Sequence, residues 1–194
     1  MTLNPHWLSG FVDGEGCFWV GIVNVTGTPT VRNPEGLITK QVQVRFTINQ
    51  HVSSIKVLYA IKRYFKCGRV TANKGKRAME TSPVYDYRVN NKDHLMENII
   101  PFFEKYSLQT AKRQDFLFFR KFVTRLSEEQ HMTTSPETGR AIWNSTVVEG
   151  WEKEINAFKA KRKWSIEKTN IETPDEARTK VLSSDVCSIP EEKG

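Results

Sequence analysis

The segment from Gln41 to Asn49 constrains the fold most, because apolar and polar side chains alternate strictly along it. One phase holds Val42, Val44, Phe46 and Ile48, and the other holds Gln41, Gln43, Arg45, Thr47 and Asn49. Successive side chains of a β-strand point to opposite faces, so this pattern predicts a strand with one buried and one polar face. A shorter alternation at 84–90 predicts a second such strand, with Tyr85, Tyr87 and Val89 inside and Asp86, Arg88 and Asn90 outside. The chain must therefore build a sheet that is covered on one face.

Helix signals flank these strands. Asn4-Pro5 predicts a helix start, with Asn as N-cap and Pro at the first position, and Gly14-Glu15-Gly16 predicts its end. A strand at 17–25, a loop or hairpin tip at 26–36 and a short strand at 69–73 are also expected. Ser53 or Ser54 is expected to cap a helix that runs through Phe65 and ends near Gly68.

The second half of the chain reads mainly as helix. One helix is expected from Lys92 to just before Pro101, and another from Thr110 to Leu126. A polar break at His131–Gly139 and a last helix over 140–163 complete the order. The result is α-β-β-α-β-β-α followed by C-terminal helices, an α+β fold with an antiparallel, saddle-shaped sheet and helices on one face.

Charge divides the chain at about residue 164. Residues 165–194 carry four Lys or Arg and seven Asp or Glu, so we expect a domain at 1–164 and a polar, flexible tail at 165–194. Within the domain, the segment 40–90 carries eleven basic residues against two acids, Glu80 and Asp86. Such an excess predicts an anionic partner, either nucleic acid or an acidic membrane surface.

The cysteines and apolar runs exclude several classes of protein. Cys17, Cys67 and Cys187 form no CxxC pair or Cys/His cluster, which argues against a disulfide framework and a zinc site. No apolar run reaches membrane-spanning length, so no membrane partner is expected. The first residues resemble neither a signal nor a transit peptide, and we expect the protein to be made where it acts.

The first predicted helix combines two glycines with two acids. Gly10 and Gly14 are four residues apart and share one helix face, where another backbone could approach closely, from within the monomer or from a second chain. Asp13 and Glu15 lie at the C-terminal end, where the helix macrodipole disfavours negative charge. A bound cation would relieve this, and oxygen ligands suit Mg²⁺.

Residues 8–16, LSGFVDGEG, resemble the signature of the LAGLIDADG homing endonucleases, and four later blocks are similar to family blocks in the same order. These blocks are FTINQH at 46–51, IKRYF at 61–65 with Gly68, IIPFF at 99–103 and KRQDF at 112–116. The resemblance covers residues 4–126 and is strongest to single-motif, intron-encoded enzymes of algal chloroplasts and mitochondria. It implies an organellar protein that hydrolyses double-stranded DNA at a long pseudo-palindromic target and so promotes intron homing.

The resemblance also implies roles for individual residues. The first helix would pack against its twin in a homodimer through Trp7, Gly10, Phe11 and Gly14. Glu15, with Gly14, would bind a divalent metal, Mg²⁺ or another such as Mn²⁺. Gln50 would order water around the scissile phosphate. Lys112 would be the basic catalytic residue, with Arg113 as the alternative.

Polar strand residues are the candidate DNA contacts, because such side chains read base edges in the major groove. They are Gln41, Gln43, Arg45, Thr47, Asn49, Arg69, Thr71, Asn73, Asp86 and Arg88. The basic tip residues Lys74, Lys76 and Arg77 are expected to contact phosphates. Trp19 lies on the outward phase of the first strand, where it would contact a thymine methyl or be buried by a neighbour.

Two other functions fit the same sequence. The fold and motif also occur in maturases that bind intron RNA and assist splicing, so intron RNA is the alternative partner. A DNA-binding regulator without catalysis is the third class. The joint presence of Glu15, Gln50 and Lys112 favours the nuclease.

Overall fold

A computed structural model describes residues 2–26, 38–73, 83–134 and 141–168, and the chain divides into two compact units, 1–152 and 153–194. Residues 27–36 of the predicted loop, the basic tip at 74–77 and most of the predicted tail lie outside the described residues, whereas Thr26 belongs to a strand. No described helix is both long enough and apolar enough to cross a bilayer.

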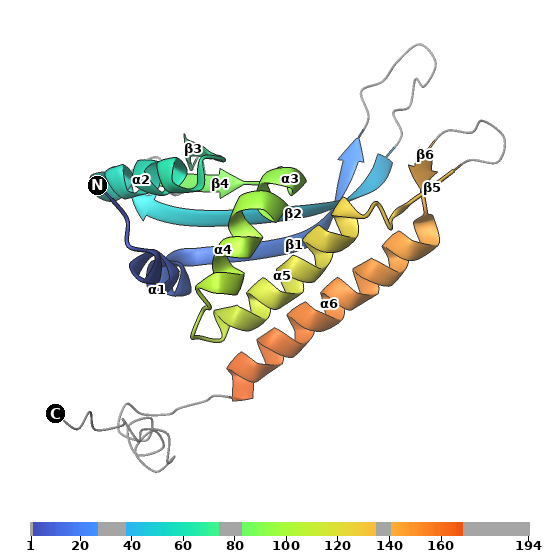
Figure 1. Cartoon of the computed structure of the whole chain (residues 1–194). Helices are drawn as coiled ribbons and strands as arrows, with labels where there is room; N and C mark the ends of the chain where they lie inside the picture. Colours follow the sequence, from blue (N-terminus) through green and yellow to red (C-terminus); the bar gives the residue numbers. More distant parts are fainter. Residues whose placement is uncertain (1, 27–37, 74–82, 135–140, 169–194) are drawn as a thin grey trace. The chain divides into compact units, whose positions relative to one another are not determined.

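The first unit follows the predicted element order (Figure 1). Helix α1 spans Pro5–Glu15 and runs directly into strand β1 (Gly16–Thr26), which is followed by β2 (Ile38–His51). A 3-10 turn (Val52–Ser54) leads to α2 (Ile55–Phe65), and β3 (Arg69–Ala72) and β4 (Val84–Val89) come next. The remaining elements are α3 (Lys92–His94), a π-helical segment (Leu95–Ile99), α4 (Ile100–Lys105), α5 (Lys112–Ser127), β5 (Met132–Thr134), β6 (Ala141–Trp143) and α6 (Ser145–Lys168).

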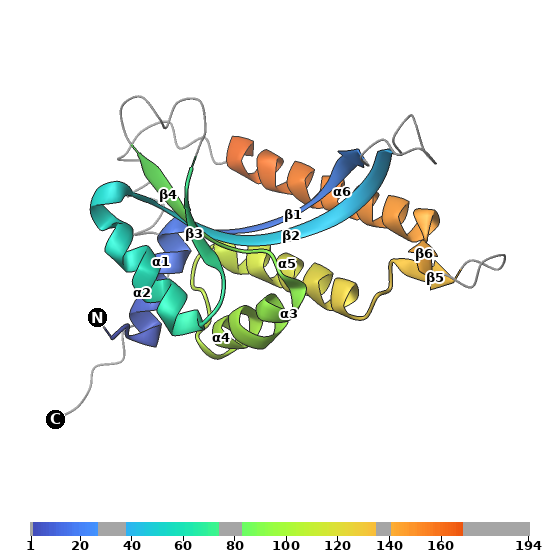
Figure 2. The ribbon, with the colours of Figure 1, turned by 90° about the horizontal axis from the view of Figure 1, so that it is seen from above.

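Strands β1 to β4 form one antiparallel sheet in the order β1-β2-β4-β3. Strand β2 pairs with β1 from Ile38 to Ile48, whereas β4 pairs only with the second half of β2, from Phe46 to His51. The long strands β1 and β2 curve along their length (Figure 2). The α+β fold and the antiparallel sheet that we expected are thus confirmed.

The covered face of the sheet is closed by aromatic side chains. Phe46 stacks on Phe18 at 5.0 Å between ring centroids and meets Phe65 of α2 and Phe103 of α4 edge-on. Phe18 in turn contacts Phe116 of α5. Burial of each such ring stabilises the fold by about 1.5–3 kcal/mol. All four apolar residues of the predicted inner phase of β2 are buried, which confirms the alternation.

The expected helix end before Pro101 is wrong. The chain remains helical through this residue, because the π-helical segment precedes it and Ile100 N–H donates to Leu95 O, five residues back. A proline cannot donate this bond and crowds the carbonyl four residues before it. The wider π turn accommodates both effects, and Pro101 lies within the first turn of α4.

The expected serine cap of α2 is also wrong. Ser54 occupies the position before the helix, but its side chain makes no capping hydrogen bond. His51 acts one turn earlier, where its Nδ1 accepts from the backbone N–H of Ser53 at 3.3 Å. The end of α2 is as expected: Lys66 is left-handed, and Gly68 has φ +77° with the Tyr87 ring and the Arg88 carbonyl close by.

The polar break predicted at 131–139 conceals a small hairpin. Strands β5 and β6 pair antiparallel, with Met132 opposite Trp143. Helix α6 therefore begins at Ser145 rather than Arg140, and Asn144 caps it by accepting from Val147 N–H at 3.2 Å. Three-residue strands are too short to show a period-two pattern, so the alternation could not reveal them.

Candidate active site and nucleic-acid interface

Helix α1 buries one face and exposes the other. Leu8, Ser9 and Val12 are buried, and the Ser9 hydroxyl donates to the Tyr106 carbonyl at 2.9 Å. On the opposite face, a Cβ atom built at Gly10 or Gly14 would meet nothing within 4 Å in the described part of the chain. Packing among the described residues therefore does not explain these glycines.

Exposed aromatic rings flank the glycines. Trp7 is 46% exposed and stacks on Phe11, with 4.9 Å between centroids and 13° between ring planes. Large apolar side chains that remain exposed beside a flat helix surface are typical of a protein–protein interface. The four residues expected at a dimer interface thus share one open face of α1.

Asp13 ties the end of α1 to the start of α5. Its carboxylate accepts from the backbone N–H groups of Gln109 (2.7 Å) and Thr110 (3.3 Å) and from the Thr110 hydroxyl (2.8 Å). Partial burial alone would raise the pKa of Asp13, but these hydrogen bonds, with the charge of Lys112, hold it below its usual value. Sequence reasoning assigned Asp13 no role.

Lys112 is the basic residue that reaches the end of α1. Its Nζ donates to the Gly14 carbonyl at 3.1 Å, next to Glu15. The last turn of α1 contains no basic residue of its own, so Lys112 supplies the positive charge that the helix C-terminus favours. Arg113, the alternative, lines a separate hollow with Glu104 and Leu117. Lys112 thus contacts the residue that precedes Glu15, whereas Arg113 lines a different hollow.

Gln50 lies at the same end of the domain as the C-terminus of α1. Strand β1 starts at Gly16 opposite Ile48 of β2, so Gln50, two residues further along β2, extends past the start of β1. The Gln50 side chain is half-buried, whereas Glu15 is exposed. The sheet register therefore brings Gln50, Glu15 and Lys112 to one end of the domain.

The oxygen atoms at this end suit a hard cation but do not complete a site. Glu15 offers a free carboxylate, and Gly14 offers a carbonyl that already accepts from Lys112. Among the described residues, no group of three His, Cys, Asp or Glu side chains is arranged to hold a metal.

The outward face of the sheet is a continuous polar surface. Gln41, Gln43, Asn49, Arg69 and Thr71 are exposed, and the Gln43 amide donates to Gln41 at 3.1 Å. Two candidates on this face are buried by their neighbours, namely Thr47 at 8% and Asp86 at 3% exposure. Asp86, a candidate DNA contact, has its carboxylate covered by Arg88 and Asn73. The tip candidates Lys74, Lys76 and Arg77 lie outside the described residues.

Asp86 and Trp19 each hold an arginine on this face. Arg88 Nη2 donates to Asp86 at 3.0 Å, and Asn73 donates to the other carboxylate oxygen at 3.2 Å. The Arg45 guanidinium lies 4.7 Å from the centre of the Trp19 ring, a cation–π contact. Trp19 is half-buried and lies across Gly21, where any Cβ would overlap the indole. The Arg45 guanidinium covers part of the half-buried Trp19 ring, and contact of Trp19 with DNA stays a prediction.

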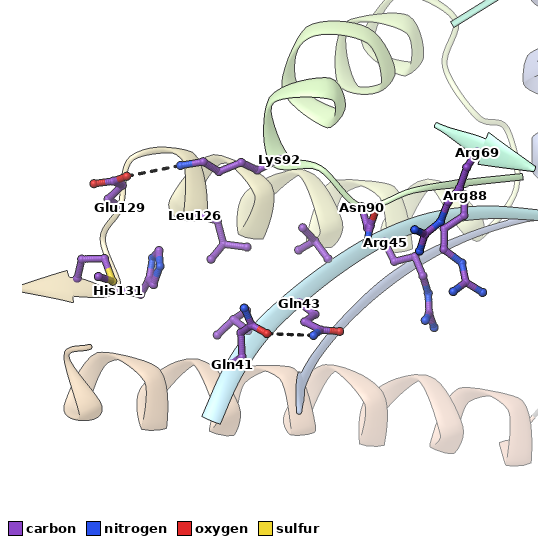
Figure 3. A pocket seen from close by; sticks show the side chains of 13 residues that line it. Gln41, Gln43, Arg45, Arg69, Arg88, Asn90, Lys92, Leu126, Glu129 and His131 are labelled. Atoms are coloured by element: carbon purple, nitrogen blue, oxygen red, sulfur yellow. Dashed lines mark hydrogen bonds and ion pairs between the residues drawn. The ribbon is translucent and has the colours of Figure 1, made fainter. Parts of the chain in front are cut away.

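These arginines border a hollow of about 720 Å³ along the edge of β2 that β4 leaves unpaired (Figure 3). The polar and charged residues that line it are Gln41, Gln43, Arg45, Arg69, Arg88, Asn90, Lys92, Glu129 and His131. At its far end, Lys92 pairs with Glu129 at 3.6 Å. The hollow is a strongly basic surface with amide groups among the cations, as expected for contact with nucleic acid.

Known proteins are similar in sequence to this chain. The sequence profile described as LAGLIDADG endonuclease matches residues 8–123. Probable intron-encoded endonuclease 2 of Neurospora crassa is 32% identical over 86% of this chain and 31% of its own length. DNA endonuclease I-CeuI of Chlamydomonas moewusii is 31% identical over 52% of this chain and 40% of its own length. The chain thus spans well under half the length of these curated relatives.

Solved structures agree with the sequence matches. The homing endonuclease I-TnaI is 35% identical, with a TM-score of 0.54 over 68% of this chain and 78% of its own. The LAGLIDADG homing endonuclease I-LtrWI, solved bound to target DNA, is 29% identical, with a TM-score of 0.53 over 66% of this chain and 39% of its own.

Proposed function

The chain belongs to the LAGLIDADG endonuclease family, and on that premise we propose that it is a homing endonuclease that cuts both strands of a long, pseudo-palindromic DNA target. The observation that carries this proposal is the hydrogen bond from Lys112 to the carbonyl of Gly14, the residue that precedes the exposed Glu15. The basic outward face of the sheet, continuous with this end of the domain, supports double-stranded DNA as the substrate.

We propose that two copies of the chain form the active enzyme. One chain has one Glu15, and the open face of α1 carries the glycines and stacked aromatic rings that a second α1 would cover. An isologous pairing of the two helices places both Glu15 residues near the two-fold axis and requires similar half-sites in the DNA.

Family members generally depend on a divalent metal, and the exposed carboxylate fits one. We propose Mg²⁺, with Mn²⁺ as a substitute, held by Glu15 of each copy and by the Gly14 carbonyl. When bound, this ion supplies Lewis acidity at the scissile phosphate and lowers the pKa of attacking water. The donor set needs two chains, in agreement with the single carboxylate per copy.

The chain's own residues perform the remaining tasks. The Lys112 ammonium, held in place by the Gly14 carbonyl, stabilises negative charge that develops on the phosphate. The Gln50 amide orders water at the same end of the sheet. The Asp13 hydrogen bonds fix the loop that precedes Lys112 and so set the position of its side chain.

The relatives named as intron-encoded endonucleases support an intron as the source of the gene, and we propose an organellar genome as its location. The test is incubation of the purified protein and Mg²⁺ with DNA that carries the intronless form of the host gene. We expect cleavage of both strands, and we expect Glu15→Gln to bind this DNA without cutting it. Glu97→Gln, at an exposed acid on the π-helical segment, is the matched control and should cut normally. Cleavage by Glu15→Gln at the wild-type rate would contradict the proposal.

A further inference from the structure

Three arginines lie next to one another on the outward face of the sheet. In the register, Arg88 of β4 is opposite Thr47 of β2 on one side and Arg69 of β3 on the other. Arg45 is two residues from Thr47 on β2 and is therefore a diagonal neighbour of Arg88. Like charges directly opposite each other destabilise a sheet. Folding alone therefore does not explain this cluster.

Negative charge within the domain does not balance the cluster. Within the described part of the chain, Asp86 is the one carboxylate that pairs with any of the three arginines. Glu129, at the far end of the hollow, pairs with Lys92 instead. The cluster thus has unused donors that face the open hollow of Figure 3.

Two of the three guanidinium groups are held in place. The Asp86 carboxylate fixes Arg88, and Asp86 is itself buried and anchored by Asn73. The Trp19 ring holds the Arg45 guanidinium through a cation–π contact. A side chain fixed before binding loses less entropy when it forms its contact, so both arginines are prepared for a defined ligand.

The ligand that fits is a guanine edge rather than a phosphate. Strands β2 and β4 are the two central strands of the sheet, so their side chains face the floor of a groove, where base edges lie. The Asp86 carboxylate, 3.0 Å from Arg88, would repel a phosphate but not a neutral base. Guanine presents two adjacent acceptors, O6 and N7, which match the guanidinium fork.

Building on the proposed function, we infer that Arg45 and Arg88 each read a guanine in every half-site, and that Trp19 and Asp86 position them rather than contact DNA. Diagonal neighbours on a sheet are about 7–8 Å apart, and base steps measure about 3.4 Å along a strand. The two guanines are therefore expected about two base pairs apart.

The test selects bound duplexes from a pool with randomised half-sites, in EDTA so that the DNA is not cut. We expect guanine at two positions in the wild-type selection. Arg88→Ala should erase the preference at one position and Arg45→Ala at the other, each by about tenfold to a hundredfold. The rest of the selected sequence should stay unchanged in both variants.

Variants of Asp86 and Trp19 test whether these residues orient the arginines or contact DNA themselves. Asp86→Asn should weaken guanine preference at the position read by Arg88 and leave the other position intact. Trp19→Leu should do the reverse, and Trp19→Phe, which keeps an aromatic face under Arg45, should restore the preference. A purely structural role would lower thermal stability and affinity for all sequences equally, without changing one position.

Failure of this inference can be distinguished from failure of the proposed function. Mg²⁺-dependent cleavage of a target whose selected half-sites contain no guanine, or equal loss of affinity for all sequences in Arg88→Ala, overturns this inference alone. Failure to bind or cut any duplex overturns the proposed function and this inference with it.

Discussion

Helices α1 and α5 are both amphipathic, but they differ in where their large apolar side chains lie. In α5, Phe116, Phe119 and Phe122 are at most 3% exposed, and the opposite face is polar. In α1, Trp7 is exposed and stacks on Phe11 beside two glycines that contact nothing in the described chain. The difference teaches that contacts within one chain explain α5, whereas contacts among the described residues do not explain the exposed face of α1, for which we propose a second copy.

The largest effect is expected in the interior of α5. Phe119→Ala removes a fully buried ring and should lower the free energy of unfolding by about 3–5 kcal/mol. Urea denaturation followed by circular dichroism measures this change. If the variant does not fold, Phe119→Leu should show a smaller loss in the same direction. A loss below about 1 kcal/mol for Phe119→Ala would show that α5 is not part of the core.

A smaller effect, on association rather than on folding, is expected on α1. Gly10→Leu inserts a side chain where we propose that a second backbone approaches, and overpacking of this kind costs about 1–3 kcal/mol. Dimer affinity, measured by sedimentation on target DNA, should fall about tenfold to a hundredfold, and cleavage should fall with it.

Gly150→Leu is the matched control for this change. Gly150 is also an exposed helical glycine, and a Cβ there meets nothing within 4 Å in the described residues. The Gly150→Leu substitution should leave association unchanged. Neither Gly10→Leu nor Gly150→Leu should unfold more easily than the wild type. Equal effects of the two substitutions on association would remove the distinction between α1 and other exposed helices.

Asp13 connects the two helices, and its loss should have an intermediate cost. Asp13→Asn keeps the size of the side chain but removes the charge that accepts from Gln109 and Thr110, at a cost of about 1–2 kcal/mol near neutral pH. The pKa of Asp13 is lowered in the folded state, so its contribution is complete above the unfolded value of about 3.9. The contribution is lost as the pH falls below that value.

Urea titrations at several pH values test this linkage. The difference in the free energy of unfolding between wild type and Asp13→Asn should therefore shrink from pH 6 toward pH 3. A difference that stays constant, or that grows in acid, would contradict the assigned hydrogen bonds.

The smallest effect is expected on the outer surface of α5. Arg120 pairs with Glu104 at 2.9 Å, but both side chains are more than 40% exposed, and such pairs contribute about 0–1 kcal/mol. Arg120→Gln should change the free energy of unfolding by less than about 0.5 kcal/mol. It should also leave cleavage unchanged. A larger loss would mean that this face of α5 is less solvated than its exposure indicates.

Local patterns predicted most of the fold. The alternation in β2 and the helical spacing of the phenylalanines in α5 both depend on burial, which repeats along an element and is therefore visible in sequence. The predicted helix end before Pro101 and the predicted serine cap of α2 are wrong because the outcome depends on a π turn and on the ring nitrogen of His51. Neither of these has a strong residue signature.

The candidate site is harder to predict from sequence than the fold, because its residues come from segments that are distant in the chain. The Asp13–Thr110 contact joins residues 97 positions apart, and no local rule brings them together. Lys112 and Arg113 are adjacent and chemically similar, so sequence left both open. The difference lies in geometry alone, because Lys112 reaches Gly14 and Arg113 lines a different hollow.

Gly21 has a consequence for how this protein would evolve. It has no side chain, yet any larger residue there would displace the Trp19 ring that the Arg45 guanidinium contacts. If the outward face reads DNA as we propose, substitutions at Gly21 should emerge together with those at Arg45 in a genetic selection for altered targets. A position without a side chain would then limit which target sequences its neighbours can recognise.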